Sequence, residues 1–183
     1  MPDARDAQQS AWLFRETEGN PLFVVESVRA GLPGPETDAG GLPATAPQVN
    51  ARALPPTVQA VIAKRLGQLS PPARALAGLA AAVGRAFSFD VLLQASRLDE
   101  EQAADALDEL WQRRIVRAYG AHAYDFTHDK LREVAYADAT PVRRRLLHRR
   151  IAEALEAVHA ADLDAVSAQV AAHYDLGGRH EEA

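Results

Sequence analysis

Apolar residues recur at helical spacing through most of residues 56–183, and short polar or proline-containing segments interrupt that spacing. The pattern predicts helices over about 56–69, 71–83, 87–97, 100–113, 128–138 and 141–159. A last helical pair is expected to begin near Leu163 and to break at Gly177-Gly178. Two further helical segments, about 7–17 and 21–30, precede a stretch rich in proline and glycine.

Residues that favour helix ends stand at the predicted boundaries. Ser70 precedes two prolines, Asp99 precedes an acidic first turn, and Thr140 precedes Pro141, so each is expected to cap a helix. Gly84 is expected to end the alanine-rich helix over 71–83. These signals favour several short helices joined by tight turns.

The apolar stripes also predict which residues are buried. Trp111 is expected to point inward with Leu107 and Leu110, and a stripe in the 141–159 helix is expected to run from Val142 to Val158. The arginines and His148 between residues 143 and 150 form a basic cluster, which we interpret as a solvated helix face. His173-Tyr174 is expected to pack between helices.

Two short stretches of strand-forming residues, 115–119 and 123–127, flank Gly120-Ala121-His122 and predict a β-hairpin. Three short helices followed by a hairpin are the order of elements in a winged helix. We therefore expect a mainly α fold, with a winged-helix domain over 70–140 that contains one β-hairpin. The start of an antiparallel helical repeat is expected over 141–183.

The remaining chain is assigned from composition. Residues 1–31 are expected to form a helical segment, 32–55 a proline- and glycine-rich linker, and 56–69 a connecting helix. The sequence contains no cysteine, no apolar run long enough for a membrane span and no signal-peptide pattern, so a cytoplasmic location without membrane contact is expected.

Charge and motifs exclude several function classes. Twenty basic and 25 acidic residues give a net charge of −5, which disfavours a general nucleic-acid binder, and acidic residues dominate the third winged-helix segment. Neither lysine, Lys64 or Lys130, follows a glycine-rich turn, so the chain lacks a P-loop and is not expected to act as an enzyme alone. The histidines show no metal-binding spacing, and no metal site is predicted.

Three sequence blocks then point to a family. They are Thr17-Glu18-Gly19-Asn20-Pro21-Leu22-Phe23, Leu54-Pro55-Pro56 leading to Leu69-Ser70-Pro71, and Phe126-Thr127-His128-Asp129-Lys130-Leu131. In this order they resemble the C-terminal half of the nucleotide-binding module of STAND-class ATPases. The resemblance extends to large ATP-binding LuxR-type transcriptional regulators and to AAA-like ATPase modules beside bacterial adenylate cyclases.

The resemblance implies a nucleotide site shared between domains. Gly19, Asn20 and Pro21 resemble the turn of a helical lid whose proline packs against adenine. His128 resembles the histidine of a Met-His-Asp motif that contacts the β-phosphate of ADP, although Thr127 stands in place of the methionine. A histidine at a helix start lies where the backbone favours anions.

The resemblance also implies what lies elsewhere. The P-loop ATPase core, its Mg²⁺ site and an output domain are expected upstream of Met1 or in other parts of a parent protein. This chain alone is then expected to bind ATP or ADP weakly or not at all, and its helical repeat is expected to receive a protein or small-molecule inducer. Two alternatives remain open: a free-standing helical adaptor that binds protein, and a winged-helix DNA-binding transcription factor, which the acidic third helix disfavours.

Overall fold

The computed structural model describes residues 14, 56–120 and 122–178. The chain divides into two compact units, 1–64 and 65–183, and each is considered by itself. In the first unit, Phe14 is helical and exposed, and α3 (Pro56–Gly67) begins there before it continues into the second unit. Phe14 apart, the predicted segments 1–31 and 32–55 lie outside the described residues.

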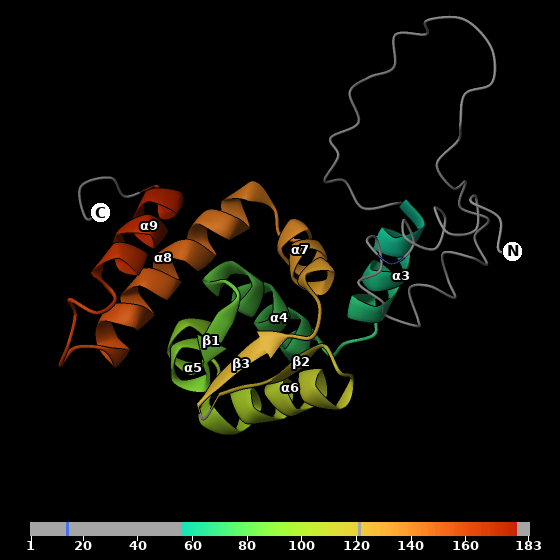
Figure 1. Cartoon of the computed structure of the whole chain (residues 1–183), viewed down its shortest axis with the longest axis horizontal. Helices are drawn as coiled ribbons and strands as arrows, with labels where there is room; N and C mark the ends of the chain where they lie inside the picture. Colours follow the sequence, from blue (N-terminus) through green and yellow to red (C-terminus); the bar gives the residue numbers. More distant parts are fainter. Residues whose placement is uncertain (1–13, 15–55, 121, 179–183) are drawn as a thin grey trace, which may run out of the picture. The chain divides into compact units, whose positions relative to one another are not determined.

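The second unit contains a winged-helix arrangement, which Figure 1 shows in green to yellow. Its elements follow in the order α4 (Pro71–Val83), β1 (Ala86–Ser88), α5 (Phe89–Ser96), α6 (Glu100–Gln112), β2 (Val116–Tyr119) and β3 (Ala123–Phe126). The strands form one antiparallel sheet in the order β1-β3-β2. The prediction of a mainly α fold is confirmed.

Local side-chain chemistry sets the helix starts as predicted. Ser70 Oγ accepts a hydrogen bond from the amide of Ala73 at 3.3 Å, and Asp99 Oδ1 accepts one from the amide of Gln102 at 2.8 Å. Thr140 Oγ1 likewise accepts from the backbone at the start of the longest described helix. Each of these bonds satisfies an amide that the helix itself leaves without an acceptor.

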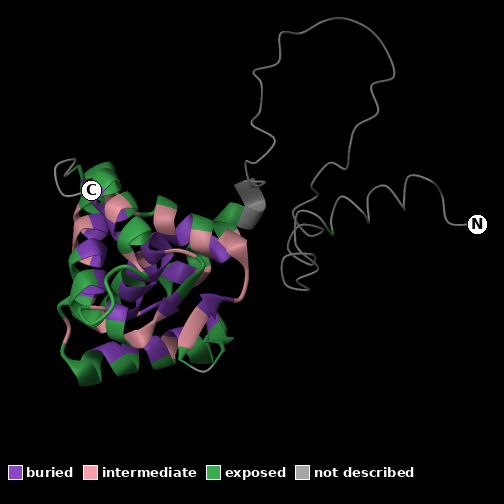
Figure 2. Cartoon of the chain, turned by 60° about the vertical axis from the view of Figure 1, so that its left-hand side comes forward, coloured by how far each residue is buried: buried purple, intermediate pink, exposed green. Residues whose placement is uncertain are grey.

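The core of the second unit lies where the helices meet the sheet, and Figure 2 shows the buried faces in purple. Its largest fully buried side chains come from α4, α5, α6, the residue before β2, and the later helices: Leu76, Leu92, Leu110, Ile115, Leu131 and Ile151. Burial of this apolar surface is the main term that stabilises the arrangement.

Three helices follow the sheet: α7 (Asp129–Ala137), α8 (Pro141–Val158) and α9 (Ser167–Gly177). The last two form an antiparallel hairpin, since Gly177 at the end of α9 lies against Arg145 and Arg149 in the first half of α8. One hairpin is present within residues 141–178; the expected repeat array stays a prediction. None of the described helices is long and apolar enough to cross a bilayer.

Several sequence predictions were wrong in detail. The sheet has a third strand, β1, because three residues before α5 pair with β3, a tertiary contact that a three-residue pattern does not reveal. Trp111 is 48% exposed, since it lies at the end of α6 beside the hairpin. Val142 and Val158 are 68% and 37% exposed because the buried stripe of α8 is confined to its middle, and α9 begins only at Ser167.

Candidate functional site

The one predicted nucleotide-binding residue that the structure describes, His128, lies between β3 and α7. It is the N-cap residue of α7, with an extended backbone (φ −146°, ψ 137°), and its side chain makes no capping hydrogen bond. The imidazole is half-buried. His128 therefore stands at the helix start, as predicted, without using its ring to cap that helix.

Hydrogen bonds fix the backbone beside His128 to the corner between α6 and β2. Thr127 Oγ1 donates to the carbonyl of Arg114 at 2.8 Å, and the amide of Thr127 donates to the carbonyl of Ile115 at 3.0 Å. Arg114 has a left-handed backbone conformation, with φ +53°, which turns the chain sharply from helix to strand. The start of α7 is thus held by the same corner that ends α6.

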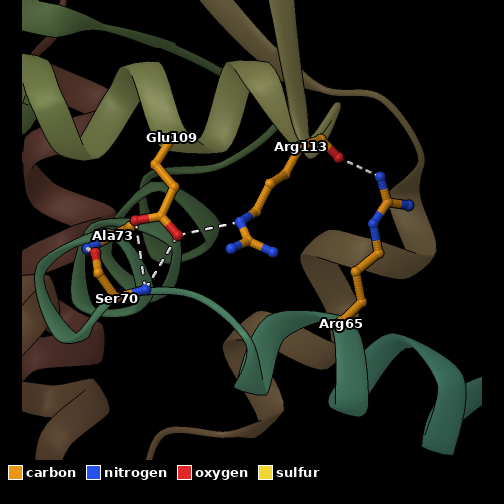
Figure 3. Close-up of polar contacts among 5 residues, drawn as sticks. All are labelled: Arg65, Ser70, Ala73, Glu109 and Arg113. Carbon is orange, nitrogen blue, oxygen red and sulfur yellow. Dashed lines mark hydrogen bonds and ion pairs between the residues drawn. The ribbon is translucent and has the colours of Figure 1, made fainter.

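The other side of this corner is held from α3. The guanidinium of Arg65 donates to the carbonyl of Arg113, as Figure 3 shows, and lies 3.5 Å from the carbonyl of Arg114. These are carbonyls at the end of α6, where a helix leaves acceptors without internal donors and favours positive charge. Burial and the neighbouring Arg113 lower the pKa of Arg65.

Glu109 connects the chain between α3 and α4 to α6. Its two carboxylate oxygens accept from the amide of Ser70 at 3.1 and 3.3 Å, and Oε1 also accepts from Arg113 Nε at 3.1 Å (Figure 3). The hydrogen bond from Ser70 is the largest of the effects that lower the pKa of Glu109, so the carboxylate stays charged.

The N-terminus of α7 has the partial positive charge of any helix start. The first turn of α7 already contains the carboxylate of Asp129, which interacts favourably with the helix N-terminus. A phosphate bound there would share the helix terminus with that carboxylate. The imidazole of His128 would then have to supply the attraction that the helix terminus alone does not.

The structure describes only one half of the predicted nucleotide site. Gly19, Asn20 and Pro21 lie outside the described residues, so their proposed contact with adenine stays a prediction. Among the described residues, no cluster of three or more histidine or carboxylate groups is arranged to hold a metal ion.

The structure contains a buried chain of polar side chains that the sequence did not predict. Tyr136 Oη lies 2.9 Å from His148 Nε2, and His148 Nδ1 lies 2.9 Å from His173 Nδ1. His173 in turn hydrogen-bonds to the backbone of Val83, so the chain connects α7, α8, α9 and the end of α4. His148 is 4% exposed, so its assignment to a solvated basic face was wrong, whereas the packing of His173-Tyr174 between helices is confirmed.

The sequence did contain a signal for this burial. His148 lies three and four positions before Ile151 and Ala152, both fully buried, and therefore falls on the inward stripe of α8. Because arginines follow it at 149 and 150, His148 was grouped with the basic residues of the solvated face.

The contacts define how protons are placed when both rings are neutral. The Val83 carbonyl accepts from the His173 ring, so Nδ1 of that ring is left as an acceptor for His148 Nδ1–H. His148 Nε2 then accepts from the hydroxyl of Tyr136. In this arrangement both nitrogens of each imidazole ring and the hydroxyl of Tyr136 have a hydrogen-bond partner.

Comparison with protein-family models, curated proteins and solved structures finds no significant match to this sequence.

Proposed function

We propose that this chain supplies the nucleotide-sensing winged helix and the relay helices of an ATP-binding regulator of the STAND class. The observation that supports this most strongly is the position of α7. Its start, at His128, is joined to the winged-helix corner through Thr127 and Arg114, and its last turn reaches the helical hairpin through Tyr136 and His148. A displacement at one end of α7 would therefore be passed to the hairpin.

In the proposed mechanism, one nucleotide is bound between the lid turn and the winged helix. The turn at Gly19, Asn20 and Pro21 packs against adenine, and His128 contacts the β-phosphate of ADP. A P-loop core elsewhere in the parent protein supplies Mg²⁺, most phosphate contacts and any hydrolysis, so this chain alone is not an enzyme. Exchange of ADP for ATP then shifts the population toward a released winged helix, by an amount equal to the difference in affinity between the two states.

The test is a titration with a fluorescent ADP analogue. The chain alone is expected to bind weakly or not at all, and the chain joined to its P-loop core is expected to bind tightly. Submicromolar affinity of the isolated chain would contradict the division of roles. Failure to find a P-loop core in the same cytoplasmic polypeptide or in a partner protein would also contradict it.

A protein-binding adaptor is the second candidate. Exposed apolar side chains on and beside the α8–α9 hairpin favour it, namely those of Val142, Leu163 and Leu176. Such side chains suit a stacked helical neighbour or a bound partner. Binding of a partner that is indifferent to nucleotide in the joined protein would favour the adaptor.

DNA binding through the winged helix is disfavoured. The helix that would enter a groove, α6, exposes Glu100, Glu101, Asp105 and Asp108. These carboxylates would be repelled by a phosphate backbone, whereas recognition helices are normally basic where they meet it.

A further inference from the structure

A hollow of about 460 Å³ lies between α6 and the β2–β3 hairpin, beside the first turn of α5. Three aromatic residues, Phe89, Trp111 and Tyr124, contribute to its lining. The carboxylates of Asp90 and Asp108 lie in the same lining, which also contains His122 but no arginine or lysine. The hollow is therefore both aromatic and acidic.

Packing beneath the hollow holds its aromatic wall in place. The rings of Trp111 and Tyr124 meet edge to face, with centroids 6.4 Å apart and planes at 88°. Tyr124 also stacks on Phe87, with centroids 6.3 Å apart, and Phe87 is buried in the core. Tyr124 packs on the buried Phe87, and the half-exposed Trp111 packs on Tyr124. The orientation of the Trp111 ring beside the hollow is therefore fixed.

The charges of the hollow are not neutralised from within. Asp90 and Asp108 are exposed, and neither forms an ion pair with another residue of the described chain. Asp105 and Glu101 extend the same side of α6 by one and two turns toward its start. A ligand that enters the hollow would therefore contact a row of carboxylates together with the aromatic residues of the lining.

We propose that this hollow binds an arginine side chain from a basic segment of a partner protein. A guanidinium can lie against an aromatic face while its N–H groups reach carboxylates, and aromatic and acidic groups together provide both contacts. Anionic ligands, including nucleotides and DNA, would be repelled. The site does not involve His128, so it stands independently of the proposed nucleotide site.

The test uses a fluorescein-labelled peptide, Gly-Ala-Arg-Ala-Arg-Ala-Gly, and the same peptide with citrulline in place of each arginine. Citrulline keeps the shape of the side chain and removes its charge. The full chain is expected to bind the arginine peptide, measured by fluorescence anisotropy, and to bind the citrulline peptide at least about tenfold more weakly, a difference of roughly 1.4 kcal/mol.

Matched variants locate the binding. The double variant Asp90→Asn, Asp108→Asn and the variant Trp111→Ala are each expected to weaken binding at least about tenfold. Asp162 and Asp164 are exposed in the loop between α8 and α9, so Asp162→Asn, Asp164→Asn makes the same change in net charge away from the hollow. That control is expected to stay within about twofold of the unchanged chain.

Three results would overturn the proposal. One is equal binding of the two peptides, and another is an equal loss in the Asp162, Asp164 control. The third is sedimentation showing that a second copy of the chain covers the hollow and that Asp90→Asn, Asp108→Asn releases it. Thermal unfolding of each variant confirms that a loss of binding does not arise from a loss of fold.

Discussion

His148 and His173 face each other through their Nδ1 atoms at 2.9 Å, in the buried interface between α8 and α9. Two ring nitrogens can share a hydrogen bond only when one has a proton and the other does not. The neutral pair meets this condition, and protonation of the acceptor nitrogen removes it. The stability of the hairpin is therefore connected to pH.

The first prediction concerns unfolding in acid. Burial, the neighbouring His148 and the opposing effect of Val83 together lower the pKa of His173 to about 4, and burial and Arg144 lower the pKa of His148. The unfolded chain takes up these protons at a pH near 6.5, before the folded chain does. The free energy of unfolding should thus fall from about pH 6.5 to about pH 4, by about 3 kcal/mol for His173.

His173→Gln isolates this effect, because glutamine does not titrate and the carboxylates of both proteins respond to acid alike. Chemical denaturation at several pH values should show the variant less stable than the unchanged chain at pH 7.5, with a gap that narrows as the pH falls to 4.5. A gap independent of pH would show that His173 does not titrate abnormally.

The second prediction concerns the close approach of α9 to α8. A Cβ added at Gly177 would lie 2.6 Å from Arg149 Cγ and 3.3 Å from the Arg149 amide nitrogen. Gly177→Ala should therefore destabilise the chain by about 1–3 kcal/mol in thermal or chemical unfolding.

Gly78→Ala is the matched control, because a Cβ there meets only the Ala135 carbonyl, at 4.0 Å. Replacing this helical glycine should stabilise the chain by about 0.5–1 kcal/mol. If both variants changed stability in the same direction and by similar amounts, the close contact of α9 with Arg149 would not explain the effect of Gly177→Ala.

The third prediction concerns Glu109. Glu109→Gln removes the carboxylate charge and one of the two oxygens that accept from Ser70 and Arg113, and should cost about 1–2 kcal/mol at pH 7 in chemical denaturation. Because the folded-state pKa is lowered, this contribution is present above the ordinary pKa of glutamate and is lost as pH falls through the folded-state value. The variant Asp105→Asn, exposed on the same helix, should change stability little; an equal loss there would indicate a general charge effect.

The sequence predicted the elements whose determinants are local. Ser70, Asp99 and Thr140 cap the helices they were expected to cap, and the hairpin strands fall within one residue of their predicted bounds. Helical periodicity and capping depend on neighbours in the chain, so they can be read in one dimension.

The features that were missed depend on contacts between distant segments. Strand β1 exists only because it pairs with β3, and the His148–His173 contact joins residues 25 positions apart. The acidic character of α6 was visible in the sequence, whereas the hollow beside Trp111 depends on where the hairpin packs. For the predicted nucleotide site, the sequence placed His128 correctly at a helix start, and its ligand stays a prediction.

The central proposal concerns the role of His128, and His128→Asn tests it without disturbing the helix. Asparagine is a favoured N-cap residue, so the variant should keep the thermal stability of α7 while it removes the imidazole. The half-buried His159, at the C-terminal end of α8, provides the control His159→Asn.

The most direct measurement is the dissociation rate of a fluorescent ADP analogue from the chain joined to its P-loop core. Loss of a charged hydrogen bond of about 1.5–3 kcal/mol predicts release at least about tenfold faster from His128→Asn than from the unchanged protein, with His159→Asn unaffected. Equal release rates for all three proteins, with unchanged folding, would contradict a contact between His128 and the nucleotide.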